Sequence, residues 1–114
     1  MEKCLFCKMV SGTLKPDVVY EDNDVLAFKD IHPQAPVHVL VIPKKHIATL
    51  NDLTAADAGI MGKLFLAARH VAEQTGVAQS GYRTVVSCNR EGGQAVYHVH
   101  MHVLGGRQMR WPPG

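Results

Sequence analysis

The stretch His98-Val99-His100-Met101-His102-Val103 sets three histidines at alternate positions, separated by apolar residues. Successive side chains of a β-strand point to opposite faces, so this alternation predicts a strand with the histidines on one face. Val99, Met101 and Val103 then point to the core, and the histidines point to solvent or a ligand. We expect this last strand to span residues 97–104, before Gly105-Gly106.

The three histidines cannot all bind one metal ion. Same-face neighbours on a strand lie about 6.6 Å apart, and the outer two lie about 13 Å apart. Zinc needs its nitrogen ligands within roughly 2.1 Å. The three side chains therefore have at least two different roles. The alternatives to a functional site are a solvated histidine face and an expression tag, but the histidines of a tag would not alternate with valines.

Phosphoryl chemistry suits this stretch. Imidazole has an unperturbed pKa near 6.5, so much of it is neutral and nucleophilic at pH 7. Just upstream, Gly92-Gly93-Gln94 allows close approach of the backbone to a ligand and can direct N–H groups at an anion. A glycine pair is usually only a turn, but beside a histidine strand it suggests a phosphate pocket.

Composition sets the limits. The 114 residues are 46% hydrophobic and 19% charged, with a net charge of +2, which predicts one globular domain over residues 1–114. The charge is too small for gripping a nucleic-acid backbone. We expect no membrane span, because apolar runs are short, and no signal peptide, so we expect a cytoplasmic protein.

The remaining pattern predicts an α+β fold with an antiparallel meander sheet. Residues 4–12 favour a short helical turn, and residues 18–20 and 25–28 a hairpin across Asp22-Asn23-Asp24. A β-branched run over 37–42 and a stretch over 82–87 predict two further strands. Residues 54–75 predict one long helix that ends at Gly76. Its expected core face comprises Ile60, Leu64, Ala67, Ala68, Val71 and Ala72.

The histidine stretch has the His-φ-His-φ-His-φ pattern of the histidine-triad (HIT) superfamily. Residues 28–46, FKDIHPQAPVHVLVIPKKH, and the tail 105–114, GGRQMRWPPG, further resemble the HINT branch, the histidine-triad nucleotide-binding proteins. The resemblance covers essentially the whole chain. It implies a homodimer with a five-stranded antiparallel sheet in each subunit, one long helix and a short N-terminal helix.

The resemblance also implies an activity. It is the hydrolysis of purine nucleoside phosphoramidates to the nucleoside monophosphate and an amine, and the resemblance also implies adenylylated lysine or aminoacyl-adenylate as substrate. By position, His100 is the nucleophile and forms a nucleotidyl-enzyme intermediate. His102 contacts the phosphate and helps to protonate the amine, and His38 supports the triad. No magnesium is required. The implied nucleotide-binding set is Phe6, Phe28, Asp30, Ile31, Leu40, Ser87, Gly93, Gln94, Ala95, His100 and His102.

Two positions depart from the family pattern. Ser87 stands where the family commonly has Asn, and Ala95 stands where eukaryotic members have a Ser that touches the phosphate. Losing a hydroxyl contact costs about 1 kcal/mol, or more where the partner is charged. These changes bear on rate and affinity rather than on the class of reaction.

Cys4-x-x-Cys7 is half of a zinc site, and two ligands do not hold zinc tetrahedrally. Some superfamily members complete the site with two histidines, which correspond to His46 and His98 here. The resemblance thus implies a structural zinc ion bound by these four residues, and free thiols are the alternative. We expect Cys88, outside this set, to be a small buried residue.

The C-terminal tail contains the only tryptophan of the sequence, Trp111. Trp111 is a large apolar residue between Arg110 and Pro112-Pro113. It either caps the core of its own subunit or, as the resemblance implies, reaches the partner's pocket and contacts the leaving group. Two other functions stay open: a dinucleoside polyphosphate hydrolase or nucleotidyl transferase, and a non-catalytic nucleotide-binding scaffold. The sequence does not identify the physiological amine, the preferred purine or the pathway.

Overall fold

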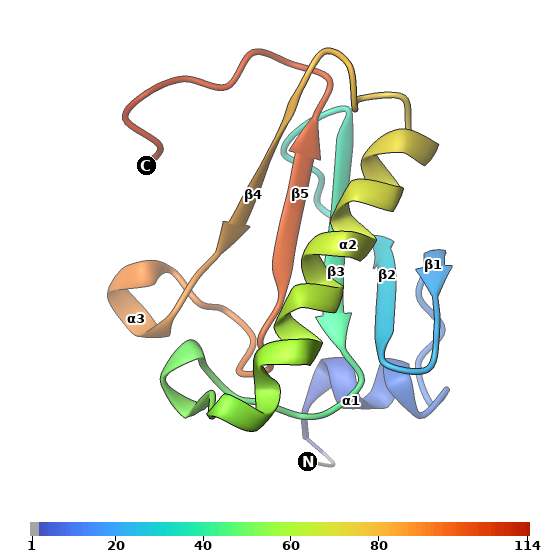
Figure 1. Cartoon of the computed structure of the whole chain (residues 1–114), viewed down its shortest axis with the longest axis vertical. Coiled ribbons are helices and arrows are strands. Elements are labelled where there is room, and N and C mark those ends of the chain that lie inside the picture. Colours follow the sequence, from blue (N-terminus) through green and yellow to red (C-terminus); the bar gives the residue numbers. More distant parts are fainter. Residues whose placement is uncertain (1–2) are drawn as a thin grey trace.

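A computed structural model describes residues 3–114, and its centre is a five-stranded antiparallel sheet in the order β1-β2-β3-β5-β4 (Figure 1). The strands are β1 (Val18–Glu21), β2 (Val25–Lys29), β3 (Val37–Pro43), β4 (Tyr82–Val86) and β5 (Met101–Gly105). The α+β class is confirmed, but the meander is wrong beyond β3. The last strand, β5, inserts between β3 and β4, because its Val99-Met101-Val103 face belongs in the centre of the core.

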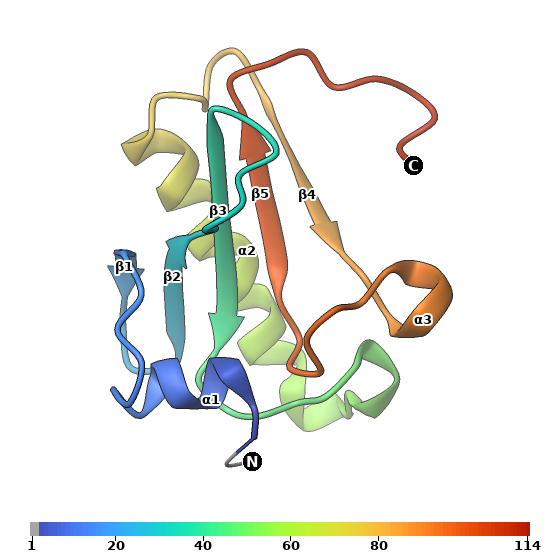
Figure 2. The ribbon, with the colours of Figure 1, turned by 180° about the vertical axis from the view of Figure 1, so that it is seen from behind.

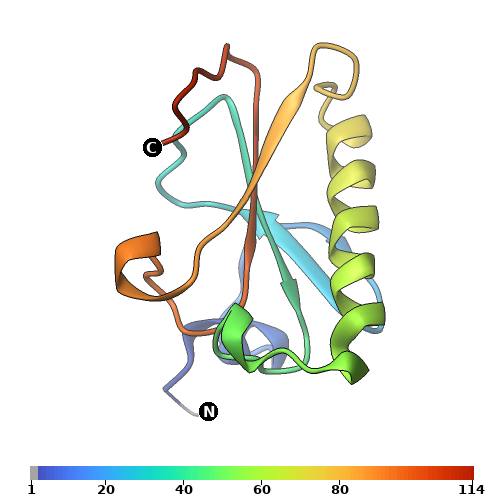
Figure 3. The ribbon, with the colours of Figure 1, turned by 60° about the vertical axis from the view of Figure 1, so that its left-hand side comes forward.

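One face of the sheet is covered by the long helix α2 (Ala58–Gln74), as Figure 3 shows. Leu64 and Val71 are fully buried against Val25, Val41 and Met101 of the sheet. Complete burial of such a side chain stabilises the fold by about 1.5–3 kcal/mol. The predicted core face of the helix is confirmed, with Ile60 only partly buried.

The helix begins later than residue 54. Residues Ala55–Asp57 form a 3₁₀ turn, and the α-helix follows it. Asp57 accepts a hydrogen bond from the Thr54 N–H at 2.9 Å and pairs with Lys45 at 2.6 Å. The hydrogen bond from Lys45 is the main reason why the pKa of Asp57 is lowered. Asp57 thus caps the turn that starts the helix and ties it to the segment after β3.

The other face of the sheet carries α1 (Leu5–Val10), near the β2 and β3 ends seen at the bottom of Figure 2. Phe6 is 3% exposed and packs with Phe28, Leu40 and Ile42 in a second, smaller core cluster. The short helix α3 (Asn89–Gly92) and the C-terminal segment also lie on the side away from α2 (Figure 3). The sequence pattern does not predict α3. Because both faces are covered over β2 and β3, most of their residues are buried, whereas β5 alternates between buried and partly buried residues.

The histidine stretch is only partly a strand. Its ladder begins at Met101, not at residue 97, because Met101 pairs with Val41 near the end of β3. Val99 instead donates its N–H to the Ile47 carbonyl at 2.7 Å. The alternation nevertheless persists, since Val99, Met101 and Val103 all enter the α2-side core.

The helices of the described residues include none that is long and apolar enough to cross a membrane.

Two glycines test this packing in opposite directions. Gly62 lies in the exposed middle of α2, and a Cβ there would meet nothing within 4 Å. We expect Gly62→Ala to raise the free energy of unfolding by up to about 1 kcal/mol. A Cβ on Gly105 would lie 2.9 Å from the Val77 Cβ, so Gly105→Ala should lower the free energy of unfolding. Urea unfolding of both variants checks the pair, and a destabilised G62A or a neutral G105A would contradict this packing.

Candidate active site and metal centre

An apolar cleft of about 680 Å³ opens on the sheet face opposite α2. Its walls come from α1, the segment that follows α1, the end of β2 and the loop before β5. Six of the residues that the sequence assigned to nucleotide binding line it: Phe6, Phe28, Asp30, Ile31, Leu40 and Ala95. Ile31 is 86% exposed at the rim, whereas Phe6 and Phe28 form a buried edge-to-face pair with ring centroids 5.5 Å apart.

His100 lies beside this cleft and is only 5% exposed. Its ring meets the edge of Phe6 at a centroid distance of 5.2 Å and that of His102 at 5.1 Å. Nδ1 lies 2.8 Å from the His98 carbonyl oxygen, which can only accept a hydrogen bond. Nδ1 therefore carries the proton, and Nε2 keeps a free lone pair. A neutral imidazole with a free lone pair is a competent nucleophile.

His102, His38 and the Gln34 backbone N–H form a chain of hydrogen bonds, which we call the histidine relay. Gln34 donates its N–H to His38 Nδ1 at 3.0 Å, so that nitrogen carries no proton. His38 Nε2 then holds the proton and donates it to His102 Nδ1 at 2.9 Å. It follows that the proton of a neutral His102 is on Nε2, where it can be donated to a ligand.

Burial keeps the relay neutral. Burial, together with the neighbouring His100 and His38, lowers the pKa of His102 to about 4. Burial also lowers the pKa of His38, against the opposing effect of the Asp30 carboxylate. That carboxylate lies 3.5 Å from His38 Nε2 and accepts the His32 N–H at 2.7 Å. It keeps lone pairs free on the cleft side, as a partner of ligand hydroxyls needs.

A second cluster lies behind Phe6. The donor atoms of Cys4, Cys7, His46 and His98 all lie within 4.8 Å of one another. Four separations that the structure gives fall between 3.2 and 3.6 Å: Cys4 to His98, Cys7 to His46, Cys7 to His98, and His46 to His98. Tetrahedral zinc, with bonds of roughly 2.1–2.3 Å, spaces its ligands roughly 3.4–3.8 Å apart. The cluster can therefore hold a metal ion such as zinc.

The tautomer of His98 also suits a metal ligand. Its Nε2 lies 2.8 Å from the Pro43 carbonyl oxygen and must donate to it. Nδ1 therefore presents its lone pair to the two thiols and to His46. A carbonyl behind the ligating ring is the usual second contact of a metal-bound histidine. Burial lowers the pKa of His98, which keeps the ring in the neutral form that ligation requires.

Local structure brings the two cysteines together. Cys4 is the N-cap of α1, and its Sγ accepts the Cys7 N–H at 3.4 Å. One helical turn thus points both thiols to the same side. His46 follows the Pro43-Lys44-Lys45 turn, and His98 lies just before β5. Cys88 is half-buried rather than fully buried and is not part of this cluster.

The other predicted residues lie elsewhere. Ser87 and Gly93 do not line the cleft, and Gly93 ends α3 with a φ of +82°. The side-chain amide of Gln94 forms hydrogen bonds inside the protein rather than facing the cleft. It accepts the Asn89 N–H at 2.8 Å and donates to the carbonyls of Ala48 and Val96 at 2.8 and 3.1 Å. Trp111 is 83% exposed on the tail, so it does not cap the core of its own subunit.

Sequence reasoning missed several contributors. The cleft is also lined by Leu5 and Met9, whose apolar side chains carry no signal beyond an ordinary helix. Gln34 and Pro43 act through backbone groups: the Gln34 N–H contacts His38 and the Pro43 carbonyl contacts His98. A motif of side chains does not predict such contacts.

The fold and the two histidine-containing clusters define a histidine-triad protein, and a family comparison agrees: the HIT domain model matches residues 11–109. The chain belongs to the HIT family. It is 46% identical over 108 residues to the purine nucleoside phosphoramidase of Escherichia coli strain K12, covering 95% of this chain and 91% of that protein.

Other relatives agree. An uncharacterized HIT-like protein of Synechococcus elongatus is 49% identical over 99% of this chain and 98% of its own. The crystal structure of a HIT family hydrolase from Legionella pneumophila superposes with a TM-score of 0.96 at 52% identity, covering 98% of this chain and 100% of that chain. The resemblance seen in the sequence is therefore confirmed.

The neutrality of His102 predicts a pH dependence of stability. Its pKa is about 4 in the folded protein and about 6.5 in an unfolded chain, so between these values the unfolded state binds more protons. The free energy of unfolding therefore rises with pH in this window and is lost as the pH falls from about 6.5 toward 4.

We expect this loss to be of order 2–3 kcal/mol for His102. Denaturant unfolding of wild type and His102→Gln at several pH values measures it. The metal cluster is the same in both proteins, so its own acid sensitivity cancels in the difference. As the pH falls, the free energy of unfolding of the wild type should fall relative to that of H102Q, and parallel curves would show that His102 is not held neutral.

Proposed function

We propose that this protein is a purine nucleoside phosphoramidase. It would hydrolyse the phosphorus–nitrogen bond of adenosine 5′-phosphoramidates such as adenylylated lysine, or the acyl–phosphate bond of an aminoacyl-adenylate, through a covalent nucleotidyl-histidine. The observation that carries this proposal is the free Nε2 of His100, buried beside the apolar cleft while its Nδ1–H is held by the His98 carbonyl. The name of the E. coli relative supports the choice of substrate.

The cleft accounts for the nucleoside. A purine is a flat apolar ring system, and the cleft offers Phe6, Phe28 and Leu40 to its faces and edges. The Asp30 carboxylate at the cleft wall accepts hydrogen bonds from the two ribose hydroxyls. With the base and ribose placed there, the 5′-phosphoryl group points toward His100 and His102.

The proposed reaction has two balanced steps. In the first, the lone pair of His100 Nε2 forms a bond to phosphorus, the phosphorus–nitrogen bond breaks, and the leaving nitrogen takes up one proton to depart as the amine. In the second, water attacks phosphorus, the bond to His100 breaks, the nucleoside monophosphate leaves and one proton is released. Proton uptake and release cancel over the cycle.

His102 supplies a hydrogen bond to the phosphoryl group. Its Nε2–H is fixed by the histidine relay, and such a donor stabilises charge that develops on oxygen in the transition state. As the resemblance implies, His102 would also help to protonate the leaving amine. Its pKa of about 4 belongs to the ligand-free protein, and the negative charge of a bound phosphoryl group would raise it.

A homodimer completes the proposal. The exposed Trp111 follows Arg110 on a tail that lies outside the core, and an 83% exposed indole gains from a partner surface. We propose that Trp111 reaches the partner's pocket and forms an apolar wall for the amine side chain. The Ser87 and Ala95 departures would then change rate and affinity without changing the reaction.

Zinc is the proposed resident ion of the Cys4, Cys7, His46 and His98 cluster. Bound there, it would supply folding energy rather than catalysis, because four protein ligands leave no open coordination position. The cysteines flank Phe6 in the sequence, so the same four residues also hold that wall of the cleft in place.

The decisive experiment compares an adenosine 5′-phosphoramidate with a dinucleoside polyphosphate, without added magnesium. We expect turnover of the first only, and a rapidly quenched reaction should contain nucleotide covalently attached to His100. His100→Ala should lower kcat by several orders of magnitude while adenosine monophosphate still binds.

Four outcomes would contradict this assignment. Attachment to another residue, or near-normal turnover by H100A, would remove His100 as the nucleophile. Preference for the dinucleoside polyphosphate with a strict magnesium requirement would favour the polyphosphate hydrolase. Tight nucleotide binding without turnover of either substrate would favour a binding scaffold.

The zinc proposal predicts one metal ion per subunit. Metal analysis of protein never exposed to chelator should find it in the wild type and not in a Cys4→Ser, Cys7→Ser double variant, whose melting temperature should fall. Cys88→Ser is the matched control, because Cys88 lies outside the cluster. Clearly substoichiometric metal in the wild type, or equal metal in both variants, would refute the site.

A further inference from the structure

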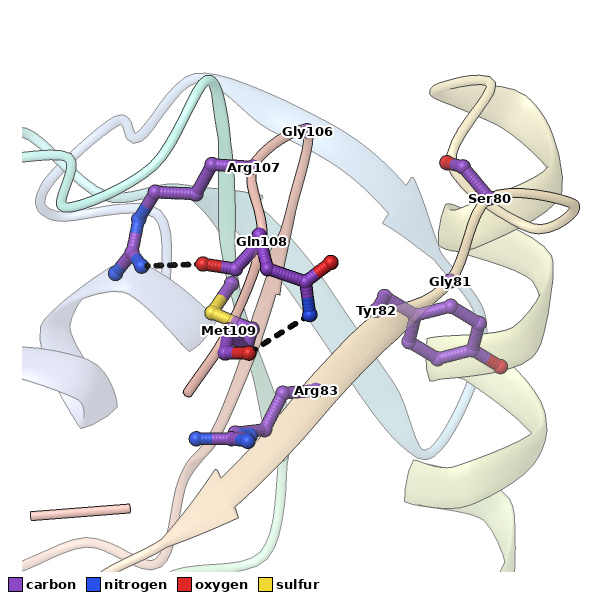
Figure 4. A pocket seen from close by; sticks show the side chains of 8 residues that line it. All are labelled: Ser80, Gly81, Tyr82, Arg83, Gly106, Arg107, Gln108 and Met109. Atoms are coloured by element: carbon purple, nitrogen blue, oxygen red, sulfur yellow. Dashed lines mark hydrogen bonds between the residues drawn. The ribbon is translucent and has the colours of Figure 1, made fainter. Parts of the chain in front are cut away.

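Arg107 connects the C-terminal segment to the histidine relay. It follows β5 directly after the Gly105-Gly106 pair, and its Nε donates to the Gln34 carbonyl at 3.0 Å. A second contact, from its guanidinium to the Gln108 carbonyl, helps to fix the side chain (Figure 4). Gln34 is the residue whose N–H donates to His38 Nδ1. The carbonyl of Gln34 therefore accepts a hydrogen bond from Arg107, while its N–H donates one to His38.

Packing reinforces this connection. Gly106 has a φ of +90°, and a Cβ added there would lie 2.9 Å from the Cβ of Pro36. The chain after β5 thus passes directly over the 33–37 loop, and no larger residue fits. Pro33 and Pro36 limit the loop from within. Gln34 also ties its own amide to the His32 carbonyl at 3.0 Å.

The relay has two possible directions. In the observed one, the Gln34 N–H occupies His38 Nδ1, and the protons point outward to His102 Nε2. If the Gln34 N–H turned away, His38 could carry its proton on Nδ1 and accept at Nε2. His102 would then donate from Nδ1 and present a bare lone pair at Nε2. Such a His102 cannot donate a hydrogen bond to a phosphoryl oxygen.

We propose that Arg107 is a positioning residue of the active site: it holds Gln34 so that the histidine relay keeps its outward direction. The inference rests on the proposed role of His102 for its effect on catalysis, but its effect on the tautomers of His38 and His102 does not depend on any activity. Arg107 touches no reacting atom and acts only through Gln34 and His38.

The alternative is that Arg107 merely belongs to a basic groove. It lines a groove of about 500 Å³ together with Arg83, Tyr82 and Met109 (Figure 4). Arg83 is the matched control, because it carries the same charge in the same groove. Among residues 3–114, the structure gives Arg83 no side-chain hydrogen bond to the Gln34 loop and no ion pair.

The test uses the full-length protein with ¹⁵N-labelled histidine. In wild type and in Arg83→Met, the nitrogen spectra should show His38 and His102 protonated on Nε2. In Arg107→Met, we expect a second population with both rings protonated on Nδ1. Arg107→Lys keeps an N–H donor near the Gln34 carbonyl and should restore the outward tautomers at least in part.

Kinetics on the adenosine phosphoramidate give the second readout. R107M should lower kcat roughly three- to tenfold, the effect of losing one such hydrogen bond. KM should change less than about twofold, because the substitution leaves the apolar cleft untouched and substrate binding in that cleft determines KM. R83M should match the wild type, and R107K should recover part of the lost kcat.

The outcomes separate cleanly. Wild-type tautomers in R107M, an R83M effect equal to that of R107M, or an R107K enzyme as impaired as R107M would overturn the positioning role. If the wild type hydrolyses no phosphoramidate, the proposed function fails, and the tautomer spectra alone still decide the role of Arg107.

Discussion

The hydrogen bond from His98 Nε2–H to the Pro43 carbonyl, 2.8 Å long, is the contact on which both sites depend. It holds the segment before β5 against the end of β3, where the strand ladder has already stopped. It turns the Nδ1 lone pair of His98 toward the two cysteines. The carbonyl of the same residue accepts Nδ1–H of His100 and leaves Nε2 of that ring free. One buried residue thus fixes the tautomer of His98 that a metal ligand would need and the tautomer of His100 that the proposed nucleophile would need.

Backbone carbonyls and N–H groups do this work because they cannot change their role. An imidazole nitrogen either donates or accepts, whereas a carbonyl only accepts and an N–H only donates. The Pro43 and His98 carbonyls and the Gln34 N–H therefore set the tautomers of three rings without any charged group. Burial lowers the pKa of His102 and so preserves the neutral forms for which these tautomers exist.

The sequence predicts the α+β class, four of the five strand positions closely, the core face of the long helix and the residues of both clusters. Patterns of side chains carry that information: alternation at 98–103, helical spacing at 60–72, and the Cys-x-x-Cys pair. The place of β5 between β3 and β4 is not local information, because it depends on which strand best covers the core. The ends of the histidine strand and the role of Gln94 depend on backbone partners far along the chain, which no motif encodes.

The position of Phe6 shows why the two sites share one short helix. Phe6 lies between the cysteines in sequence, meets His98 at a ring distance of 5.9 Å and His100 at 5.2 Å, and lines the cleft. A helix of six residues is too short to be stable alone, so its position must come from tertiary contacts. The thiol–imidazole cluster behind α1 and the apolar packing around Phe6 provide them together. The short helix α1 therefore supplies both the two cysteines of the thiol–imidazole cluster and one wall of the apolar cleft.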